Sequence, residues 1–195
     1  MKIPHASFVL IRHGQTDANR DGRVAGRIEA VLTEAGRQGA KRLSEWIWPK
    51  DMVLFASPQN RAQETARLGF PGQEPFLLDG IRERNWGVYE GRPVADLLPR
   101  EHTPDQGEAW ADMVTRVAHS IAVAHDHAKG RFPVLVAHSG VIRAARELTG
   151  GIAGGPAPEN TTPYLFKADG DGWQEVALAM RDSAWAAETL VSARS

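Results

Sequence analysis

Three short, mostly apolar runs constrain the fold more than any other feature of this sequence. They cover residues 7–11, 52–56 and 134–137 and are rich in β-branched and aromatic residues. Runs of this length without polar alternation are typical of strands buried on both faces of a sheet. Each run is followed by residues with helical hydrophobic spacing, and this alternation predicts an α/β fold. We expect a three-layer α/β/α sandwich around a mostly parallel central sheet.

Capping residues predict where the first two helices begin. Thr33 is the expected N-cap of a helix that continues toward Pro49. Ser57 offers a capping hydroxyl before Pro58, a residue favoured at the first helical position, and the helix is expected to reach about Leu68.

The second half of the chain carries the longest helical pattern. Apolar residues recur between 108 and 127 at a spacing that keeps one stripe toward the core. Another helix is expected before Gly150, a C-terminal stop signal. Two tail strands, 164–168 and 175–180, are joined by residues 169–172, whose glycines favour a hairpin turn. The alanine-rich end from Ser183 is expected to fray.

Residues 1–195 are expected to form one domain, because 195 residues match one domain of ordinary size. Between residues 76 and 104 the apolar pattern weakens, and prolines and glycines indicate loops and short helical pieces. We interpret residues 80–107, approximately, as a lid-like excursion from the core.

Composition excludes several classes of function. The sequence has no cysteine, which excludes disulfides, thiolate metal sites and cysteine nucleophiles. A formal net charge of -1 argues against nucleic acid or an anionic membrane as a partner. The sequence shows no signal-peptide core and no membrane-length apolar run, so a cytoplasmic protein is expected. His125 and His127 lie two apart in a predicted helix, point to different sides and are expected on a solvated face rather than at a metal.

Polar side chains, among them two arginines and two histidines, follow the three predicted strands. Arg12 and His13 follow the first, Ser57 and nearby Arg61 follow the second, and His138 follows the third. Ligands of open α/β sheets bind beyond the carboxyl ends of the strands, so these side chains are expected in one crevice. Guanidinium groups match phosphate oxygens in a bidentate manner, and helix N-termini add N–H donors. The sequence therefore predicts a phosphate site.

The motifs around these residues resemble those of the histidine phosphatase superfamily, the phosphoglycerate mutase-like proteins, across most of the chain. The matching segments are Arg12-His13-Gly14-Gln15-Thr16 with Asn19, residues 32–36, residues 57–66, residues 81–91 around Glu83, and Ala137-His138-Ser139-Gly140. The resemblance implies a phosphoglycerate mutase-like fold and a reaction that needs neither a metal nor another cofactor.

The resemblance also implies a role for each matching residue. His13 would attack phosphorus and become a phosphohistidine, and a backbone carbonyl could fix the tautomer that this attack needs. Glu83 would protonate the leaving alkoxide, although Glu90 lies in the same segment. The residues expected to bind the phosphoryl group are Arg12, His13, Thr16, Asn19, Arg61, His138 and Ser139.

The predicted function is hydrolysis of a small phosphorylated metabolite. A phosphoglycerate mutase is the first alternative, but the mutases of the family carry a longer basic insertion than the stretch from Gly91 to Asp112. A noncatalytic phosphate-binding domain is the second alternative. The presence of Glu83 argues against it, because phosphate binding alone would not need an acid at that position. Sugar phosphates, phosphoglycerates, nucleotide-derived esters and cobalamin-pathway phosphates all fit these features.

Overall fold

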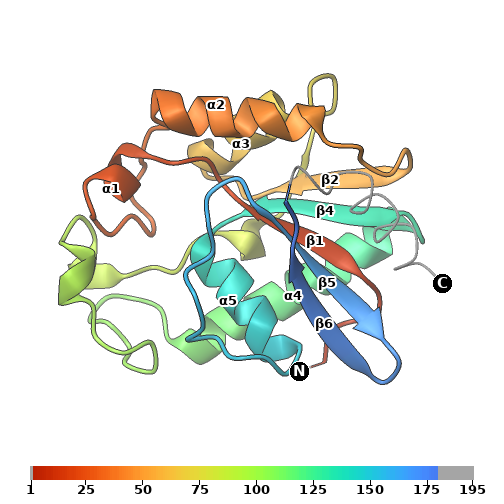
Figure 1. Ribbon diagram of the computed structural model, residues 1–195. Helices are drawn as coiled ribbons and strands as arrows, with labels where there is room; N and C mark the ends of the chain where they lie inside the picture. Colours follow the sequence, from red (N-terminus) through yellow and green to blue (C-terminus); the bar gives the residue numbers. More distant parts are fainter. Residues whose placement is uncertain (1, 180–195) are drawn as a thin grey trace.

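The computed structural model describes residues 2–179 (Figure 1). Its strands within this range are β1 (Phe8–Arg12), β2 (Met52–Ala56), β3 (Phe76–Leu77), β4 (Phe132–Ala137), β5 (Pro163–Asp169) and β6 (Gly172–Ala177). The α-helices are α1 (Asp17–Arg20), α2 (Glu34–Arg42), α3 (Asn60–Gly69), α4 (Trp110–Ala128) and α5 (Ser139–Leu148). Short 3-10 helices are η1 (Leu43–Glu45), η2 (Asp79–Ile81), η3 (Gly87–Tyr89) and η4 (Val94–Asp96).

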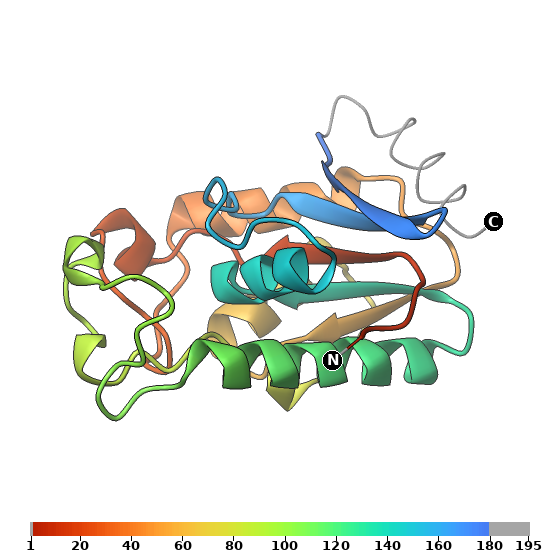
Figure 2. The ribbon, with the colours of Figure 1, turned by 90° about the horizontal axis from the view of Figure 1, so that it is seen from below.

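The strands form one mostly parallel sheet in the order β3-β2-β4-β1-β5-β6. Strands β1 to β4 run parallel, whereas β5 pairs antiparallel with β1 and β6 pairs antiparallel with β5. Helices α2 and α3 cover one face, and α4 and α5 cover the other (Figures 1 and 2). The predicted three-layer sandwich is confirmed.

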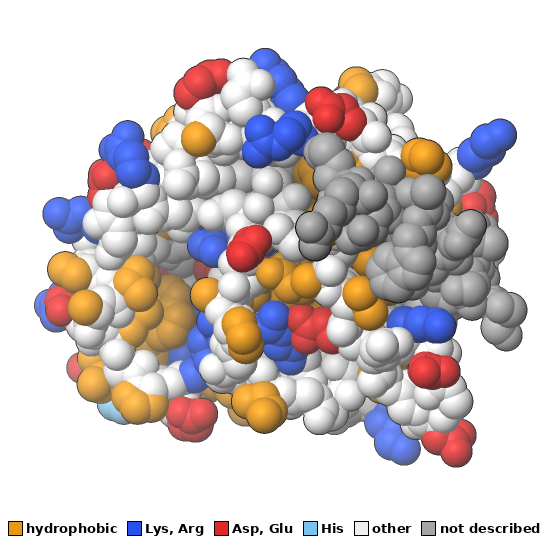
Figure 3. Space-filling view, viewed as in Figure 1, with side chains coloured by type: hydrophobic (Ala, Val, Ile, Leu, Met, Phe, Trp, Pro, Cys, Tyr) orange, Lys and Arg blue, Asp and Glu red, His pale blue; other side chains and the backbone are white. Residues whose placement is uncertain are grey.

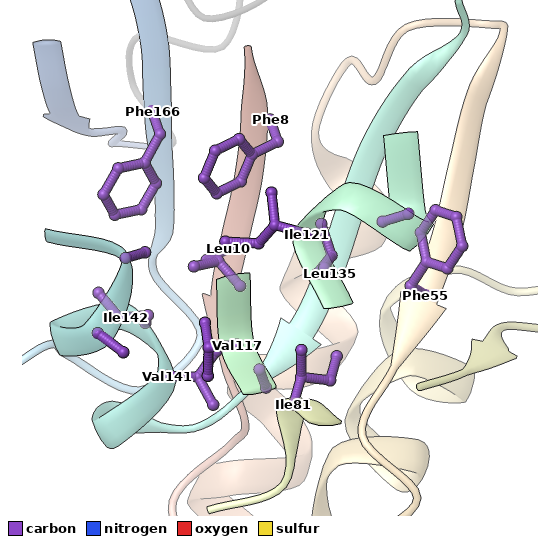
Figure 4. Packing of buried hydrophobic residues seen from close by; sticks show 14 of the residues in the cluster. Phe8, Leu10, Phe55, Ile81, Val117, Ile121, Leu135, Val141, Ile142 and Phe166 are labelled. Atoms are coloured by element: carbon purple, nitrogen blue, oxygen red, sulfur yellow. The ribbon is translucent and has the colours of Figure 1, made fainter. Parts of the chain in front are cut away.

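Side chains alternate between the two faces along each strand and so build two separate cores. Phe8 and Leu10 of β1 pack with residues of α4 and α5, such as Ile121 and Ile142 (Figure 4). The intervening Val9 and Ile11 belong to the cluster under α2 and α3. Because both faces are covered, β1, β2 and β4 are apolar along almost their whole length, which explains the uninterrupted runs in the sequence.

The start of α3 differs from the prediction. The helix begins at Asn60, its N-cap is Gln59, and Ser57 is not the cap. The Ser57 hydroxyl instead accepts from Gln59 N, just before the helix, at 3.3 Å and lies 2.8 Å from His138 Nε2. The Thr33 cap is confirmed, since its hydroxyl accepts from Gly36 N at 3.0 Å.

Smaller differences concern element ends. The first predicted helix stops at Arg42 and continues only as η1, well before Pro49. Strand β3 was not predicted, because it has two residues and both are exposed. The last strand begins three residues earlier than predicted and ends at Ala177. Its predicted end at 180 and the predicted fraying from Ser183 lie outside the described residues.

The carboxyl ends of β1, β2 and β4 point toward one end of the molecule, where α1 and residues 80–107 lie (Figures 1 and 2). Backbone hydrogen bonds join these two parts: Val24 N donates to Arg92 O at 2.8 Å, and Val94 N donates to Gly22 O at 2.8 Å. The space-filling view shows hydrophobic side chains gathered at this end (Figure 3). Within residues 2–179, no helix has the length and apolar character needed to cross a membrane.

Candidate active site

His13 directly follows β1 and is held from several sides. Its N–H donates to Ala137 O of the neighbouring strand at 3.0 Å, and its carbonyl accepts from Asn160 Nδ2 at 2.7 Å. Gly14 N donates to Thr65 Oγ1 at 2.9 Å. The ring nitrogen Nδ1 lies 2.8 Å from Gly14 O, so Nδ1 carries the proton and donates it to this carbonyl. Nε2 is left unprotonated, with no hydrogen bond to any described residue.

His138 follows β4 and faces His13 across a short distance. The ring centroids are 5.1 Å apart, and the ring planes are inclined by 61°. His138 Nε2 lies 2.8 Å from Ser57 Oγ, and Nδ1 is buried with no hydrogen-bond partner. The two histidines predicted to share one crevice therefore do lie together.

Two arginines approach the same place from β1 and α3. Arg12 Nη1 donates to Pro158 O at 2.8 Å. Arg61 is only 1% exposed and donates from its two terminal nitrogens to three carbonyls within residues 25–28, at 2.9 to 3.1 Å. In both arginines the Nε–H is buried without a partner.

These unpaired atoms are informative because a buried polar group without a partner costs about 1–3 kcal/mol. Four such side-chain atoms occur among residues 2–179, and three of them are Arg12 Nε, Arg61 Nε and His138 Nδ1. The fourth is His125 Nε2, on α4. Three nitrogens able to donate, clustered around His13, are suited to the oxygens of an anion.

The electrostatics of the cluster keep both imidazoles neutral. Burial lowers the pKa of His13 well below the ordinary 6.5, and the charges of Arg61 and Arg12 lower it further, against a smaller opposite effect of the Gly14 hydrogen bond. Burial also lowers the pKa of His138 strongly, and the charge of Arg61 lowers it further. A neutral His13 with a free Nε2 is the form that can act as a nucleophile.

Glu83 lies beside the N-terminus of α5, next to His138. Its Oε2 accepts from Gly140 N at 3.0 Å, and its Oε1 accepts from Arg84 N at 2.8 Å. Arg116 supports the same segment by donating to the carbonyl of Glu83 at 3.2 Å. Glu90, the other acid considered from the sequence, instead accepts four backbone N–H groups outside this cluster. The structure therefore brings Glu83 to the histidines.

Thr16 and Asn19 form a capping box at the start of α1. Thr16 N donates to Asn19 Oδ1 at 3.1 Å, and Asn19 N donates to Thr16 Oγ1 at 3.2 Å. Asn19 Oδ1 also lies 3.3 Å from Asn160 Nδ2, the group that holds the His13 carbonyl. Ser139 is the first residue of α5 and directly follows His138. Binding of phosphate by Thr16, Asn19 and Ser139 stays a prediction.

Sequence reasoning missed Asn160 and Gln59. Asn160 stands in an irregular loop before β5, next to Thr161, whose φ is positive, and no sequence pattern marks it. Gln59 was hidden by the predicted cap at Ser57; its Oε1 accepts from Glu83 N at 2.8 Å. Across the described part of the chain, no three His, Cys, Asp or Glu residues are grouped as a metal site. The rings of His125 and His127 contact Phe8 and Phe76 rather than only solvent.

Fold and site together define an α/β protein with a neutral, oriented histidine at a strand end, flanked by the half-buried Arg12 and the buried Arg61. The model of the histidine phosphatase superfamily (branch 1) matches residues 8–180, and this chain belongs to that family.

Individual relatives agree with this assignment. A probable phosphatase of Schizosaccharomyces pombe, C1687.21, is 34% identical over 146 residues, which cover 70% of each chain. Phosphoglycerate mutase-like protein 4 of Arabidopsis thaliana is 28% identical over 88% of this chain and 84% of its own length. The structure of the Mycobacterium tuberculosis open reading frame Rv3214 superposes with a TM-score of 0.78 at 23% identity, covering 90% of this chain and 97% of the other, and supports the fold.

Proposed function

We propose that the protein is a phosphomonoesterase that hydrolyses a small phosphorylated metabolite through a phosphohistidine on His13. The observation that carries this proposal is the His13 ring, whose Nδ1 is held by Gly14 O at 2.8 Å while Nε2 stays unpaired beside three unsatisfied buried nitrogens. The phosphatase name of a relative that is 34% identical supports hydrolysis.

In the first step, the Nε2 lone pair of His13 attacks phosphorus, and the bond between phosphorus and the ester oxygen breaks. Arg12, Arg61 and His138 donate hydrogen bonds to the other phosphoryl oxygens, and the two arginines neutralise their charge. If Ser57 donates its hydroxyl proton to His138 Nε2, the unpaired Nδ1 carries the ring proton and donates it to the phosphoryl group. Thr16, Asn19 and Ser139 complete the set of expected phosphate ligands.

Glu83 handles the protons of both steps. As an acid it gives its proton to the leaving alkoxide, and as a base it takes a proton from the water that attacks the phosphohistidine. The N–P bond then breaks, inorganic phosphate leaves and His13 is regenerated. Each Glu83 oxygen accepts one backbone N–H, which leaves lone pairs available for the proton.

Two further expectations belong to this proposal. Residues 80–107 act as a lid of a single domain, supported by their hydrogen bonds to residues 22–24, which follow α1. The site acts on a small substrate in the cytoplasm, with no nucleic acid or membrane as a partner.

The proposal is tested with p-nitrophenyl phosphate and a panel of metabolite phosphates. His13→Ala should abolish phosphate release while the circular dichroism spectrum and thermal unfolding remain those of a folded protein; unchanged turnover would refute the nucleophile. Phosphate release and isomer interconversion are measured in the same samples. Interconversion of 2- and 3-phosphoglycerate without release would establish the mutase instead.

A further inference from the structure

The Glu90 carboxylate is the centre of a dense set of backbone contacts outside the histidine cluster. Its Oε2 accepts from Gly26 N at 2.9 Å and from Ile28 N at 3.4 Å. Its Oε1 accepts from Arg27 N and from Trp86 N, each at 2.9 Å. A single carboxylate therefore organises residues 25–28, here called the bridging loop, and ties them to the start of η3.

The other side of the bridging loop faces Arg61. The carbonyls of Ala25, Gly26 and Ile28 accept from the Arg61 guanidinium at 3.0, 2.9 and 3.1 Å. The loop thus directs N–H groups toward the carboxylate of Glu90 and carbonyls toward the guanidinium. Peptide dipoles aligned between two opposite charges favour this arrangement. The bridging loop is the connection through which Glu90 can fix Arg61.

Two more contacts show how closely this arrangement is fitted. A Cβ on Gly26 would overlap the Arg84 carbonyl and the Glu90 carboxylate, so no larger residue fits there without displacement. Gln59 spans the gap to the acid: its Nε2 donates to Gly26 O at 2.6 Å and its Oε1 accepts from Glu83 N at 2.8 Å. The bridging loop therefore contacts the elements that carry Arg61 and Glu83.

We propose that Glu90 is a positioning residue, which holds the bridging loop so that Arg61 presents its unpaired Nε–H to the phosphoryl group. This inference rests on the proposed function, because it assigns Arg61 to phosphate binding. In Glu90→Gln, an amide nitrogen would face backbone N–H groups and could not accept from them. The loop would then turn away, and Arg61 would lose the carbonyls that fix its guanidinium.

The test is a double-mutant cycle with Glu90→Gln and Arg61→Lys, read out by calorimetric titration with inorganic phosphate and by kcat/KM for p-nitrophenyl phosphate. We expect Glu90→Gln to weaken phosphate binding about tenfold, in the range of coupling between residues that share a network. In the Arg61→Lys background, Glu90→Gln should change the logarithm of the dissociation constant for phosphate by less than half as much as in the wild type. Glu90→Asp, which keeps the charge, should bind phosphate more tightly than Glu90→Gln.

Glu64→Gln is the matched control, because Glu64 lies on α3 like Arg61 but forms a partly exposed ion pair with Arg37. It should bind phosphate like the wild type. Wild-type affinity in a folded Glu90→Gln, or full additivity with Arg61→Lys, would overturn the inference. If Glu90→Gln does not fold, the cycle is run with Glu90→Asp, whose effect on phosphate binding should be smaller in the Arg61→Lys background; full additivity would overturn the inference. Failure of the wild type to bind phosphate at all would instead overturn the proposed function, and with it the inference.

Discussion

At the scale of single residues, the site depends on buried nitrogens whose protonation is set by their surroundings. His13 is 4% exposed and His138 is fully buried, and each has one ring nitrogen in a hydrogen bond and one without. Burial and the two neighbouring arginines stabilise the neutral rings, so that no separate base is needed to deprotonate His13. Under the proposed function, the same two arginines would bind phosphate and keep the His13 nucleophile unprotonated.

This dual role gives a pH prediction. Because the pKa of His13 is lowered first by burial and then by Arg61, kcat/KM should not decline near pH 6.5 through protonation of His13. Arg61→Met removes one of these charges, so the acid limb of its profile should shift to higher pH. Comparing the variant with the wild type cancels the titration of the substrate phosphate, whose second pKa is about 6. Arg37→Met serves as the control, and an unshifted limb in Arg61→Met would contradict the electrostatic argument.

The strand-end residues of the site could be predicted from sequence, whereas their supports could not. Arg12, His13 and His138 follow uninterrupted apolar runs, and such runs indicate both the strand and its end. Asn160 and the bridging-loop contacts of Glu90 depend on irregular segments far apart in the chain, for which no periodicity exists. Ser57 was assigned to a cap because its contact with His138 spans 81 residues and leaves no local signal.

At the scale of elements, α3 connects Arg61 with the segment that directly follows His13. It carries Arg61 and, one turn later, Thr65, which is fully buried. The Thr65 hydroxyl donates to Arg61 O at 2.7 Å and accepts from Gly14 N at 2.9 Å. The residue after the nucleophile is therefore attached directly to the helix that carries the arginine.

We expect Thr65→Val to be costly although the side chains have similar shapes. The buried Gly14 N–H would lose its partner, at about 1–3 kcal/mol in the free energy of unfolding. Thr65→Ser keeps the hydroxyl and should retain most of the stability and most of kcat/KM. Urea unfolding of both variants measures the difference; equal stability for valine and serine would show that this hydrogen bond has no such role.

More of the fold than of the site could be predicted from the sequence. Long elements with a clear period were placed within a few residues, and α4 runs from 110 to 128 against an expected 108 to 127. The two-residue β3 has no periodicity that a sequence can show, and Ser57, the predicted cap of α3, contacts the distant His138 while the helix begins at Asn60. Prediction from sequence was poorest where long-range contacts override local preference.

At the scale of the whole molecule, a site with two buried neutral histidines makes stability depend on pH. The pKa of each is lowered in the folded state, chiefly by burial, so below pH 6.5 the unfolded chain binds more protons than the folded one. Their contribution to stability is fully present above this pH and is lost as the pH falls toward the folded-state pKa values.

Between pH 6.5 and 5, each histidine should lower the free energy of unfolding by about 1.4 kcal/mol per pH unit once its unfolded form is protonated. Urea unfolding across this range measures the slope. His138→Gln should reduce this slope by the contribution of one histidine, about 1.4 kcal/mol per pH unit. A slope that is the same in the variant and the wild type would show that His138 takes up its proton in the folded state.

The central claim is that phosphorus bonds to the Nε2 atom of His13, and trapping the phosphoenzyme tests it most directly. The protein is mixed with a phosphate ester on the millisecond scale, quenched in alkali to preserve phosphohistidine, and analysed by peptide mass spectrometry and ³¹P NMR. One phosphoryl group on Nε2 of His13, absent from His13→Ala, is the predicted result. Turnover without any phosphoenzyme under conditions in which it should accumulate, or a phosphoryl group on another residue, would contradict the account.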